Sequence, residues 1–359
     1  MSTKGLSFFL GANTPKGFVS KFGEIFDHAG GYRTYIIKGG PGTGKSTLMR
    51  KFAALLEKNG YNPEKIFCAS DPASFDAVIA HELKTSLVDG TAPHILEPKY
   101  PGASENILNL GEFWEEAKLA SATEKIAHLI EENSRRHENC CRFLGAAASM
   151  QSDTYQLALD YTDVPKIAQA VRRLAKKELK PLEDKTGRET KRFLSAVTWS
   201  GVHSFCEENC KQFERIYVIE DRYGVVSRLY LSAMRSLALE NGYDIISCNC
   251  PVSACESLEH IFIPEAGVAF VTSNNFHPVE FEAYRRIHAA RFTDIDGIKA
   301  HKKRIGYNKK TAGQLIEEAS NLLKEAKTIH DELEELYKGA VDFAQTNAMS
   351  EKLLEKLVN

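Results

Sequence analysis

The sequence lacks any apolar run that approaches the roughly 20 residues needed to span a bilayer. Its first residues also lack the plan of a secretory signal, in which a basic segment precedes an apolar one. The two absences argue against a membrane-spanning protein and against export. We therefore expect a cytoplasmic protein without a membrane partner.

An excess of charge of one sign is also lacking. The 46 lysines and arginines nearly balance 48 aspartates and glutamates, and the formal net charge is -2. Proteins that bind nucleic acids usually carry a basic field. A nucleic acid is therefore not indicated as a partner.

The eight cysteines lack the paired C-x₂-C spacing of structural zinc sites. They include Cys206 with Cys210, and the group Cys248, Cys250 and Cys255. In a reducing compartment such residues are typically buried, reduced thiols. We predict that role here, rather than a structural metal.

What the sequence does contain is an internal repeat. A chain of 359 residues is longer than one core usually holds, which predicts two domains. Residues 8–20 recur in register as residues 192–204, and later landmarks follow in the same order. The pairs are residues 35–37 with 217–219, Gly42 with Gly224, residues 59–61 with 241–243, Cys68 with Cys248, Glu82 with Glu265, Val88 with Val271, and His94 with His277. The chain is thus predicted to be a tandem duplication, with domains at 1–183 and 184–359.

Each half reads as a strand, a loop, a helix and two further short apolar runs. In the first half the later runs cover residues 65–69 and 84–88, and in the second half residues 244–248 and 267–271. Continuous apolar strands that alternate with helices predict an α/β fold with a parallel sheet in each half.

Long helical patterns close both halves. Apolar residues at spacings of three and four extend from Leu119 to Leu129 and from Ala319 to Leu336. A further helix is predicted after each pattern, at about residues 164–179 and 341–357. Two interpretations stay open, namely helices that flank the sheets and a protruding helical lid.

One loop of the first half matches G-x-x-x-x-G-K-[ST] at every fixed position. It follows the apolar run at residues 35–37 and precedes a predicted helix at residues 47–59, which is the context of a phosphate-binding P-loop. Backbone amides and the start of the helix would hold phosphate, Lys45 would reach the β- and γ-phosphates, and Ser46 would hold Mg²⁺. The predicted nucleotide-binding residues are Gly39, Gly40, Pro41, Gly42, Thr43, Gly44, Lys45, Ser46 and Thr47.

The corresponding loop of the second half, residues 221–228, has lost this pattern. Ser227 stands at the position of Lys45, and Arg228 stands at the position of Ser46. Asp221 adds a negative charge where a phosphate would lie. We predict that the second half is degenerate and binds no nucleotide.

A second acidic group near the metal is expected at the end of an apolar strand, and Asp89 fits that place. Thr272 stands opposite Asp89 in the half that also lost its lysine. The next residue is Gly90, where many motor-type ATPases have a water-activating glutamate. That departure favours kinases or switch-like NTPases.

Other candidate residues follow the second predicted strand. Asp71 could position an acceptor hydroxyl or a water molecule, or it could cap a helix that begins at Pro72. Asp76 follows slightly further on. His94 could sense phosphate, but His277 persists in the degenerate half, which favours a structural role. The arginines that could reach the γ-phosphate are Arg135, Arg136, Arg142, Arg172, Arg173, Arg222 and Arg228.

These residues resemble a poorly characterised family of bacterial tandem P-loop proteins, described as ATPases or nucleotide-kinase-like proteins. The matching stretches are residues 39–47, 70–72, 88–94, 98–103 and 109–114, together with the duplicated openings at 9–17 and 193–201. The resemblance implies nucleotide binding, and members of the family can carry a P-loop in both halves, from which residues 221–228 depart. Residues 98–103 and 109–114 look like an acceptor or lid surface, although core packing is the default for Phe113 and Trp114.

The sequence thus predicts a Mg²⁺-dependent NTPase with one ATP site in the first half, in which Lys45, Asp89 and Asp71 are catalytic. ATP, or another nucleoside triphosphate, and Mg²⁺ would be bound there, and Ser46 and Asp89 would be the metal ligands. One alternative is a kinase that phosphorylates a nucleotide or another small acceptor. Another is an ATP-controlled module whose helices bind a protein partner.

Overall fold

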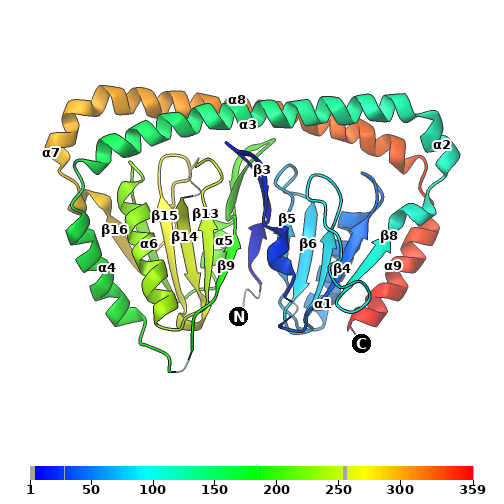
Figure 1. Ribbon diagram of the computed structural model, residues 1–359, viewed down its shortest axis with the longest axis horizontal. Helices are drawn as coiled ribbons and strands as arrows, with labels where there is room; N and C mark the ends of the chain where they lie inside the picture. Colours follow the sequence, from blue (N-terminus) through cyan, green and yellow to red (C-terminus); the bar gives the residue numbers. More distant parts are fainter. Residues whose placement is uncertain (1–4, 28, 184, 254–256, 359) are drawn as a thin grey trace.

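The computed structural model describes residues 5–27, 29–183, 185–253 and 257–358. Two six-stranded sheets lie side by side beneath a layer of two long helices (Figure 1). The first sheet has the order β1-β5-β6-β7-β4-β8 and the second the order β9-β13-β14-β15-β12-β16. The first contains β1 (Ser7–Phe9), β4 (Arg33–Lys38), β5 (Glu64–Phe67), β6 (Phe75–Ala80), β7 (Thr85–Asp89) and β8 (Glu105–Asn109). The second contains β9 (Glu189–Arg192), β12 (Arg215–Glu220), β13 (Ile245–Asn249), β14 (Leu258–Ile263), β15 (Val268–Ser273) and β16 (Arg285–His288).

The predicted parallel sheet is present in each half in part, because each sheet is mixed, with one strand that runs against its neighbours. β6 pairs antiparallel with both β5 and β7, and β14 does the same with β13 and β15. A short hairpin connects β6 to β7, so the chain reverses without a crossover helix. β6 contains the charged residue Asp76, so its sequence is not a continuous apolar run and did not predict a strand.

The α/β architecture and its duplication are present in the strand order itself. Position by position, β9 corresponds to β1, β12 to β4 and β14 to β6. Each half also has a small hairpin, formed by β2 (Gly11–Thr14) with β3 (Gly17–Ser20) and by β10 (Ser195–Thr198) with β11 (Gly201–Ser204). One landmark of the sequence comparison is misplaced. Both Cys68 and Cys250 follow the β-bulge of their strand and bond to the chain just before the next strand, so Cys250, not Cys248, corresponds to Cys68.

Strand alternation divides the buried side chains between a central core and two outer cores. Ile36 and Val218 face the central core, which both halves share. Their neighbours Ile37 and Ile219 point to the opposite faces of their sheets. The outer faces are covered by α1 (Lys45–Lys58) in the first half and by α6 (Val225–Glu240) in the second.

The terminal helices of the two halves are exchanged. α4 (Val164–Glu178) belongs to the first half in sequence, but its Ile167 and Val171 lie in the outer core of the second sheet. α9 (Phe343–Val358) belongs to the second half, and its Leu354 lies in the outer core of the first sheet. Each outer core is therefore completed by a helix from the opposite side of the predicted boundary at 183/184.

Two helices of 37 residues carry this exchange, α3 (Thr123–Leu159) and α8 (Lys302–Lys338). They run antiparallel across the top of both bodies (Figure 1). Arg136 pairs with Glu325 toward one end of the layer, and Asp153 pairs with Arg304 toward the other. Thus α3 and α8 form a layer over the sheets, while α4 and α9 flank them. The interpretation as a lid describes α3 and α8, and the interpretation as flanking helices describes α4 and α9.

Short helices connect these elements, namely α2 (Glu116–Ser121), α5 (Cys206–Cys210) and α7 (Ile295–Ile298). The described cysteines are free thiols, and Cys206, Cys210 and Cys248 are buried, whereas Cys255 lies outside the described residues. Among the helices described, none combines the length and the apolar character needed to cross a membrane.

Candidate functional site

The first loop, defined as residues 39–46, joins β4 to α1 at the carboxyl edge of the sheet. Lys45 Nζ donates to the carbonyl oxygens of Gly39 at 2.9 Å and Gly40 at 2.7 Å. The hydroxyl of Thr43 donates to Gly40 at 2.8 Å and fixes the curve of the loop. Among the described residues, the amides of Gly42 and Gly44 have no hydrogen-bond acceptor, and these are the donors that a phosphate would use.

Asp89 lies beside this loop, as the sequence predicts. β7 runs parallel to β4 with Asp89 opposite Ile37, so both strands end at the same edge. The Asp89 carboxylate is 3.7 Å from Lys45 Nζ, and its other oxygen accepts from the amide and hydroxyl of Thr91. Ser46 Oγ accepts from the Phe75 amide at 3.0 Å. Asp89 thus lies beside Lys45, and Ser46, the next residue, contacts the start of β6.

Asp76 is a further acidic group at this edge, and its place in the sequence pattern predicts no role for it. It lies at the start of β6, is buried, and interacts electrostatically with Asp89 and Lys45. Burial raises the pKa of Asp76 to about 6, and the charge of Asp89 adds to the shift, whereas His94 and Lys45 oppose it. His94 is also buried and stacks on Phe22 with ring centroids 4.2 Å apart. Asp76 is therefore a carboxyl group that can exchange a proton near neutral pH.

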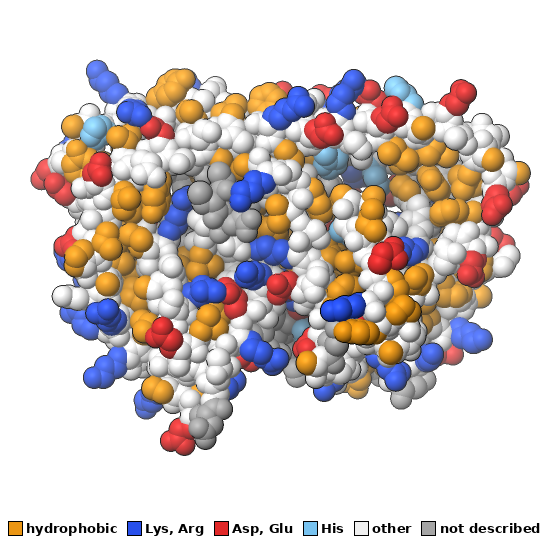
Figure 2. All heavy atoms as spheres, in the orientation of Figure 1, with side chains coloured by type: hydrophobic (Ala, Val, Ile, Leu, Met, Phe, Trp, Pro, Cys, Tyr) orange, Lys and Arg blue, Asp and Glu red, His pale blue; other side chains and the backbone are white. Residues whose placement is uncertain are grey.

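The end of α8 covers the first loop. A Cβ atom built on Gly40 would lie 2.4 Å from the Tyr337 ring, and one built on Gly42 would lie 2.8 Å from the Glu334 carbonyl oxygen. Trp114 packs edge-on against Tyr337, with ring centroids 5.7 Å apart. The exchange of helices thus places residues of the second half directly on the glycine loop of the first. Figure 2 shows a hollow between the helical layer and the first body, with histidine side chains at its border.

Asp71 lies at the tip of the β5–β6 connection, where it faces α8. No helix follows it: its side chain accepts from Ala73 and its carbonyl accepts from Ser74 in a tight turn before β6. The helix-capping interpretation is therefore wrong. Lys327 Nζ from α8 lies 3.7 Å from the Asp71 carboxylate. Sequence reasoning could not find Lys327, because its approach depends on the exchange of helices.

The seven candidate arginines lie elsewhere. Arg172 and Arg173 are on α4, and Arg222 and Arg228 are at the second loop, so these four belong to the body built on the second sheet. Arg135 pairs with Glu132 and Arg136 with Glu325 within the helical layer, and Arg142 is exposed on α3. Two cations of α8 come close to this part of the first half: Lys327 approaches Asp71, and Lys338 Cγ would lie 3.0 Å from a Cβ atom built on Gly42 in the first loop.

The second loop, defined as residues 221–228, is closed by its own carboxylate. Asp221 accepts from the amides of Tyr223, Gly224 and Ser227 at 2.8 to 3.0 Å, and from the Ser227 hydroxyl at 3.0 Å. Asp221 is buried, and one of the amides that it occupies, that of Gly224, is the counterpart of the open Gly42 amide in the first loop. The physical reason for the degenerate pattern is therefore occupation of the amides by Asp221, in addition to charge repulsion.

A cavity of about 600 Å³ lies at the second loop. Its walls come from the loop, from the carboxyl ends of the second-sheet strands, and from both long helices. Glu259 and His277 are among its lining residues. By strand register Glu259 corresponds to Asp76, because Ala77 pairs with Val88 as His260 pairs with Val271.

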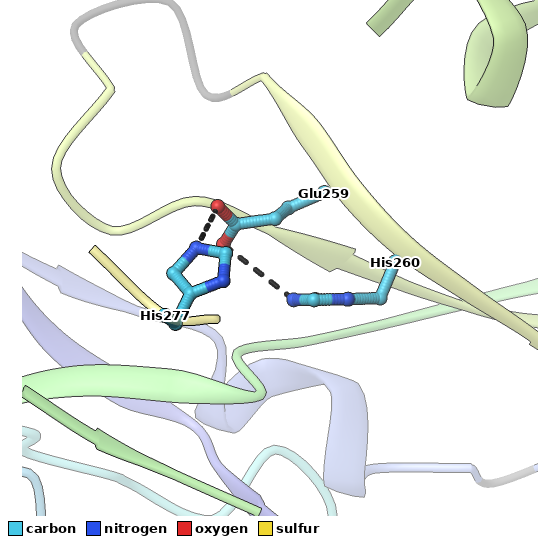
Figure 3. Close-up of side chains that lie close together, drawn as sticks. All are labelled: Glu259, His260 and His277. Atoms are coloured by element: carbon cyan, nitrogen blue, oxygen red, sulfur yellow. Dashed lines mark hydrogen bonds and ion pairs between the residues drawn. The ribbon is translucent and has the colours of Figure 1, made fainter. Parts of the chain in front are cut away.

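Glu259, His260 and His277 form the one group of potential metal ligands found among the described residues (Figure 3). Glu259 Oε1 is 2.5 Å from His277 Nε2, and Oε2 is 3.7 Å from His260 Nε2. Burial raises the pKa of Glu259, but His277 and His260 outweigh burial and hold the pKa well below its usual range. Burial lowers the pKa of His277, yet the Glu259 charge reverses this and leaves the pKa raised.

Hydrogen bonding argues against a metal in this group. The Thr272 amide donates to Nδ1 of His260 at 3.3 Å, so the proton of the neutral ring sits on Nε2, which faces Glu259. Nε2 of His277 donates to Glu259 Oε1 at 2.5 Å, so it offers no lone pair to a metal. Histidines that bind metals instead donate their other ring nitrogen to an acceptor. The group is better described as a buried ion pair of Glu259 and His277, with a neutral His260 beside it.

No protein-family model, no curated protein and no solved structure matches this chain.

Proposed function

We propose that the protein is a Mg²⁺-dependent P-loop NTPase that binds ATP or another nucleoside triphosphate at the first loop. The observation that carries this proposal is the contrast between the two loops. In the first loop the amides are open and Lys45 lies beside Asp89, whereas in the second loop Asp221 takes the amides. Open amides at the start of a 14-residue helix, with a lysine beside them, favour a bound polyphosphate.

Four residues at and beside the first loop have different roles in in-line phosphoryl transfer. Lys45 exchanges its two loop carbonyls for phosphate oxygens and, with the loop amides, stabilises the charge that develops on them. Lys327 of α8, which also pairs with Asp331, lies beside Asp71 and fixes the position of its carboxylate. Asp71, at the edge of the site, orients the attacking water or acceptor hydroxyl, and Asp76, with its raised pKa, can accept a proton.

The donor set also fits Mg²⁺. The Ser46 hydroxyl and the Asp89 carboxylate are hard oxygen ligands, which Mg²⁺ prefers; Ser46 is in the first turn of α1, and Asp89 is the last residue of β7. When bound, the metal supplies charge neutralisation at the β- and γ-phosphate oxygens. The same residues would serve a kinase, in which an acceptor hydroxyl takes the place of the attacking water.

The test compares Lys45→Ala with Ser227→Ala, the matched change at the equivalent position of the second loop. We expect Lys45→Ala to lower the rate of phosphate release by about a hundredfold or more, as is typical for loss of a charge-stabilising donor. Nucleotide affinity, measured by calorimetry with Mg²⁺, should fall in the same variant, whereas Ser227→Ala should retain both properties. Hydrolysis of ATP by Lys45→Ala at the parental rate would refute the assignment.

A second assay separates the kinase from the NTPase. The protein is incubated with γ-labelled ATP and a panel of nucleosides and nucleotides, and the label is followed. An NTPase releases it only as free phosphate, whereas a kinase transfers it to an acceptor. The contact of α8 with the first loop favours the third function, an ATP-controlled interaction module. A nucleotide bound in the loop would change this contact and could thereby shift α8. Slow turnover combined with nucleotide-dependent capture of a partner would favour that module.

A further inference from the structure

The cavity at the second loop has a positively charged lining. Four of its lining residues, Arg222, Arg228, Lys302 and Lys309, have no carboxylate within ion-pair distance in the described part of the chain. Asp221 and Glu259 also line the cavity, but both carboxylates have partners. Asp221 accepts hydrogen bonds from the loop amides, and Glu259 forms an ion pair with His277. Uncompensated positive charge in a concave site attracts an anion.

Arg228 is held in place at the centre of this charge. Its guanidinium lies 4.8 Å from the ring centroid of Tyr155, which belongs to α3. A Cβ atom built on Gly224 would lie 3.7 Å from Arg228 Nε, so the side chain extends back over the second loop. The arginine therefore presents a fixed cation where the phosphates of a nucleotide lie in the first half, and an arginine binds phosphate oxygens with two parallel donors.

Glu259 supplies a second recognition group. It is nine-tenths buried, it lines the cavity, and its Oε2 atom has no hydrogen-bond partner among the described residues. His260 Nε2 is 3.7 Å from this oxygen, which is too long for a hydrogen bond. A buried carboxylate oxygen without a donor is costly. A hydroxyl group of a ligand would satisfy it.

We propose that this cavity binds a hydroxylated phosphate monoester, such as a sugar phosphate or a nucleoside monophosphate. The phosphate dianion would meet Arg228 and the neighbouring cations, and a ligand hydroxyl would donate to Glu259. A volume of about 600 Å³ is within the usual range for sites of small ligands. Asp221 keeps a polyphosphate from the loop amides, so the site differs from a P-loop. The proposal does not depend on nucleotide hydrolysis in the first half.

Calorimetry on the full chain tests the proposal, with ribose 5-phosphate and AMP as probes of the two sources of such a group. We expect at least one of them to bind more tightly than inorganic phosphate. Arg228→Gln and Lys302→Glu should each weaken that binding by about tenfold or more, the usual effect of losing one charge-assisted contact. Lys45→Ala should leave it unchanged, because that residue belongs to the other loop.

A matched pair of ligands tests the contact to Glu259. Glycerol 3-phosphate and propyl phosphate have a similar size, and they differ in two hydroxyl groups. We expect the hydroxylated ester to bind more tightly, and equal affinity would contradict the assigned role of Glu259. Lys302 is exposed, so Lys302→Glu should keep the parental melting temperature and serve as the variant with intact folding. If no probe binds more tightly than inorganic phosphate, or if binding is lost in Lys45→Ala but retained in Lys302→Glu, the proposal is wrong.

Discussion

Phe9 and Phe193 exchange both of their backbone hydrogen bonds. Each amide donates to the carbonyl of the other residue at 2.9 Å, which forms an isolated antiparallel bridge between the two halves. The two phenylalanines are equivalent positions of the repeat. Reciprocal contact of equivalent residues is the mark of a two-fold axis between identical subunits. The chain is thus built as a fused pseudo-dimer whose axis passes through the central core.

The exchanged helices obey the same reciprocity. The amide of Asp342 donates to the Phe113 carbonyl at 2.9 Å, and the amide of Asp163 donates to the Phe292 carbonyl at 2.8 Å. In each case the residue just before a terminal helix is fixed to the body of the other half. This arrangement is an intramolecular counterpart of domain swapping, in which each body needs a segment from its partner.

The first prediction concerns the halves as separate chains. Residues 1–183 lack α9 and residues 184–359 lack α4, so each has an outer core open to water. We expect neither fragment alone to unfold cooperatively, and an equimolar mixture to recover the circular dichroism and melting transition of the intact chain. The control introduces Leu354→Asp in the buried seam of α9, which should prevent association, and Lys356→Asp on its exposed side, which should not. A cooperative monomeric transition of residues 1–183 at the parental temperature would contradict the exchange.

The second prediction concerns acid sensitivity at the contact between the sheets. Glu64 on β5 and Arg192, the last residue of β9, form a buried ion pair at 2.7 Å. Burial raises the pKa of Glu64, but Arg192 and His81 outweigh burial and lower the pKa to about 2, against an ordinary value of 4.5. Because the folded-state pKa is the lower one, this stabilisation is present above about pH 4.5 and is lost as the pH falls toward 2. The free energy involved is about 3 kcal/mol.

Glu64→Gln tests this contribution by urea unfolding at neutral pH and at about pH 3. The variant should lose about 3 to 5 kcal/mol at neutral pH, because Arg192 stays buried without a counter-charge. It should also lose less stability than the parent between the two pH values. Glu57→Gln, which removes a half-exposed partner of Lys65, should change stability by about 0.5 kcal/mol or less. Equal acid sensitivity in the parent and in Glu64→Gln would exclude this pair as the cause.

The third prediction concerns the contact of α8 with the first loop. Gly40→Ala places a methyl group 2.4 Å from the Tyr337 ring, so we expect a loss of about 1 to 3 kcal/mol in the protein without nucleotide. In a Tyr337→Ala background the same change should cost almost nothing, since the obstructing ring is gone. Gly306→Ala, in an open part of α8, is the control and should stabilise the helix by about 1 kcal/mol. An equal cost of Gly40→Ala in both backgrounds would show that the ring is not the reason for the glycine.

The sequence could predict the part of the site that depends on the order of strands and helices along the chain. α1 begins with Lys45 and Ser46, and β7 ends with Asp89. Both places lie at the carboxyl edge of adjacent parallel strands, and the order of strands and helices along the chain predicts this edge. The repeat also predicted two similar sheets. The approach of Lys327 to Asp71 and of Tyr337 to the first loop could not be predicted, because both depend on which body each long helix crosses to. Cys68 was paired with Cys248 because cysteines stand at both Cys248 and Cys250, and residue identity alone does not choose between them. The β-bulge, which both halves have at the same place, identifies Cys250 as the counterpart.

The last prediction concerns Asp221, whose carboxylate closes the second loop. Asp221→Ala leaves three amides and the Ser227 hydroxyl without their acceptor, and we expect a loss of about 2 kcal/mol. The freed amides then resemble those of the first loop, so sulfate in place of chloride at equal ionic strength should raise the melting temperature of the variant more than that of the parent. Asp244→Ala removes another buried carboxylate that accepts from a backbone amide, yet it lies away from the loop. It should lose stability without being rescued by sulfate, and rescue of both variants to the same extent would mean that sulfate acts on the whole protein rather than on the opened loop.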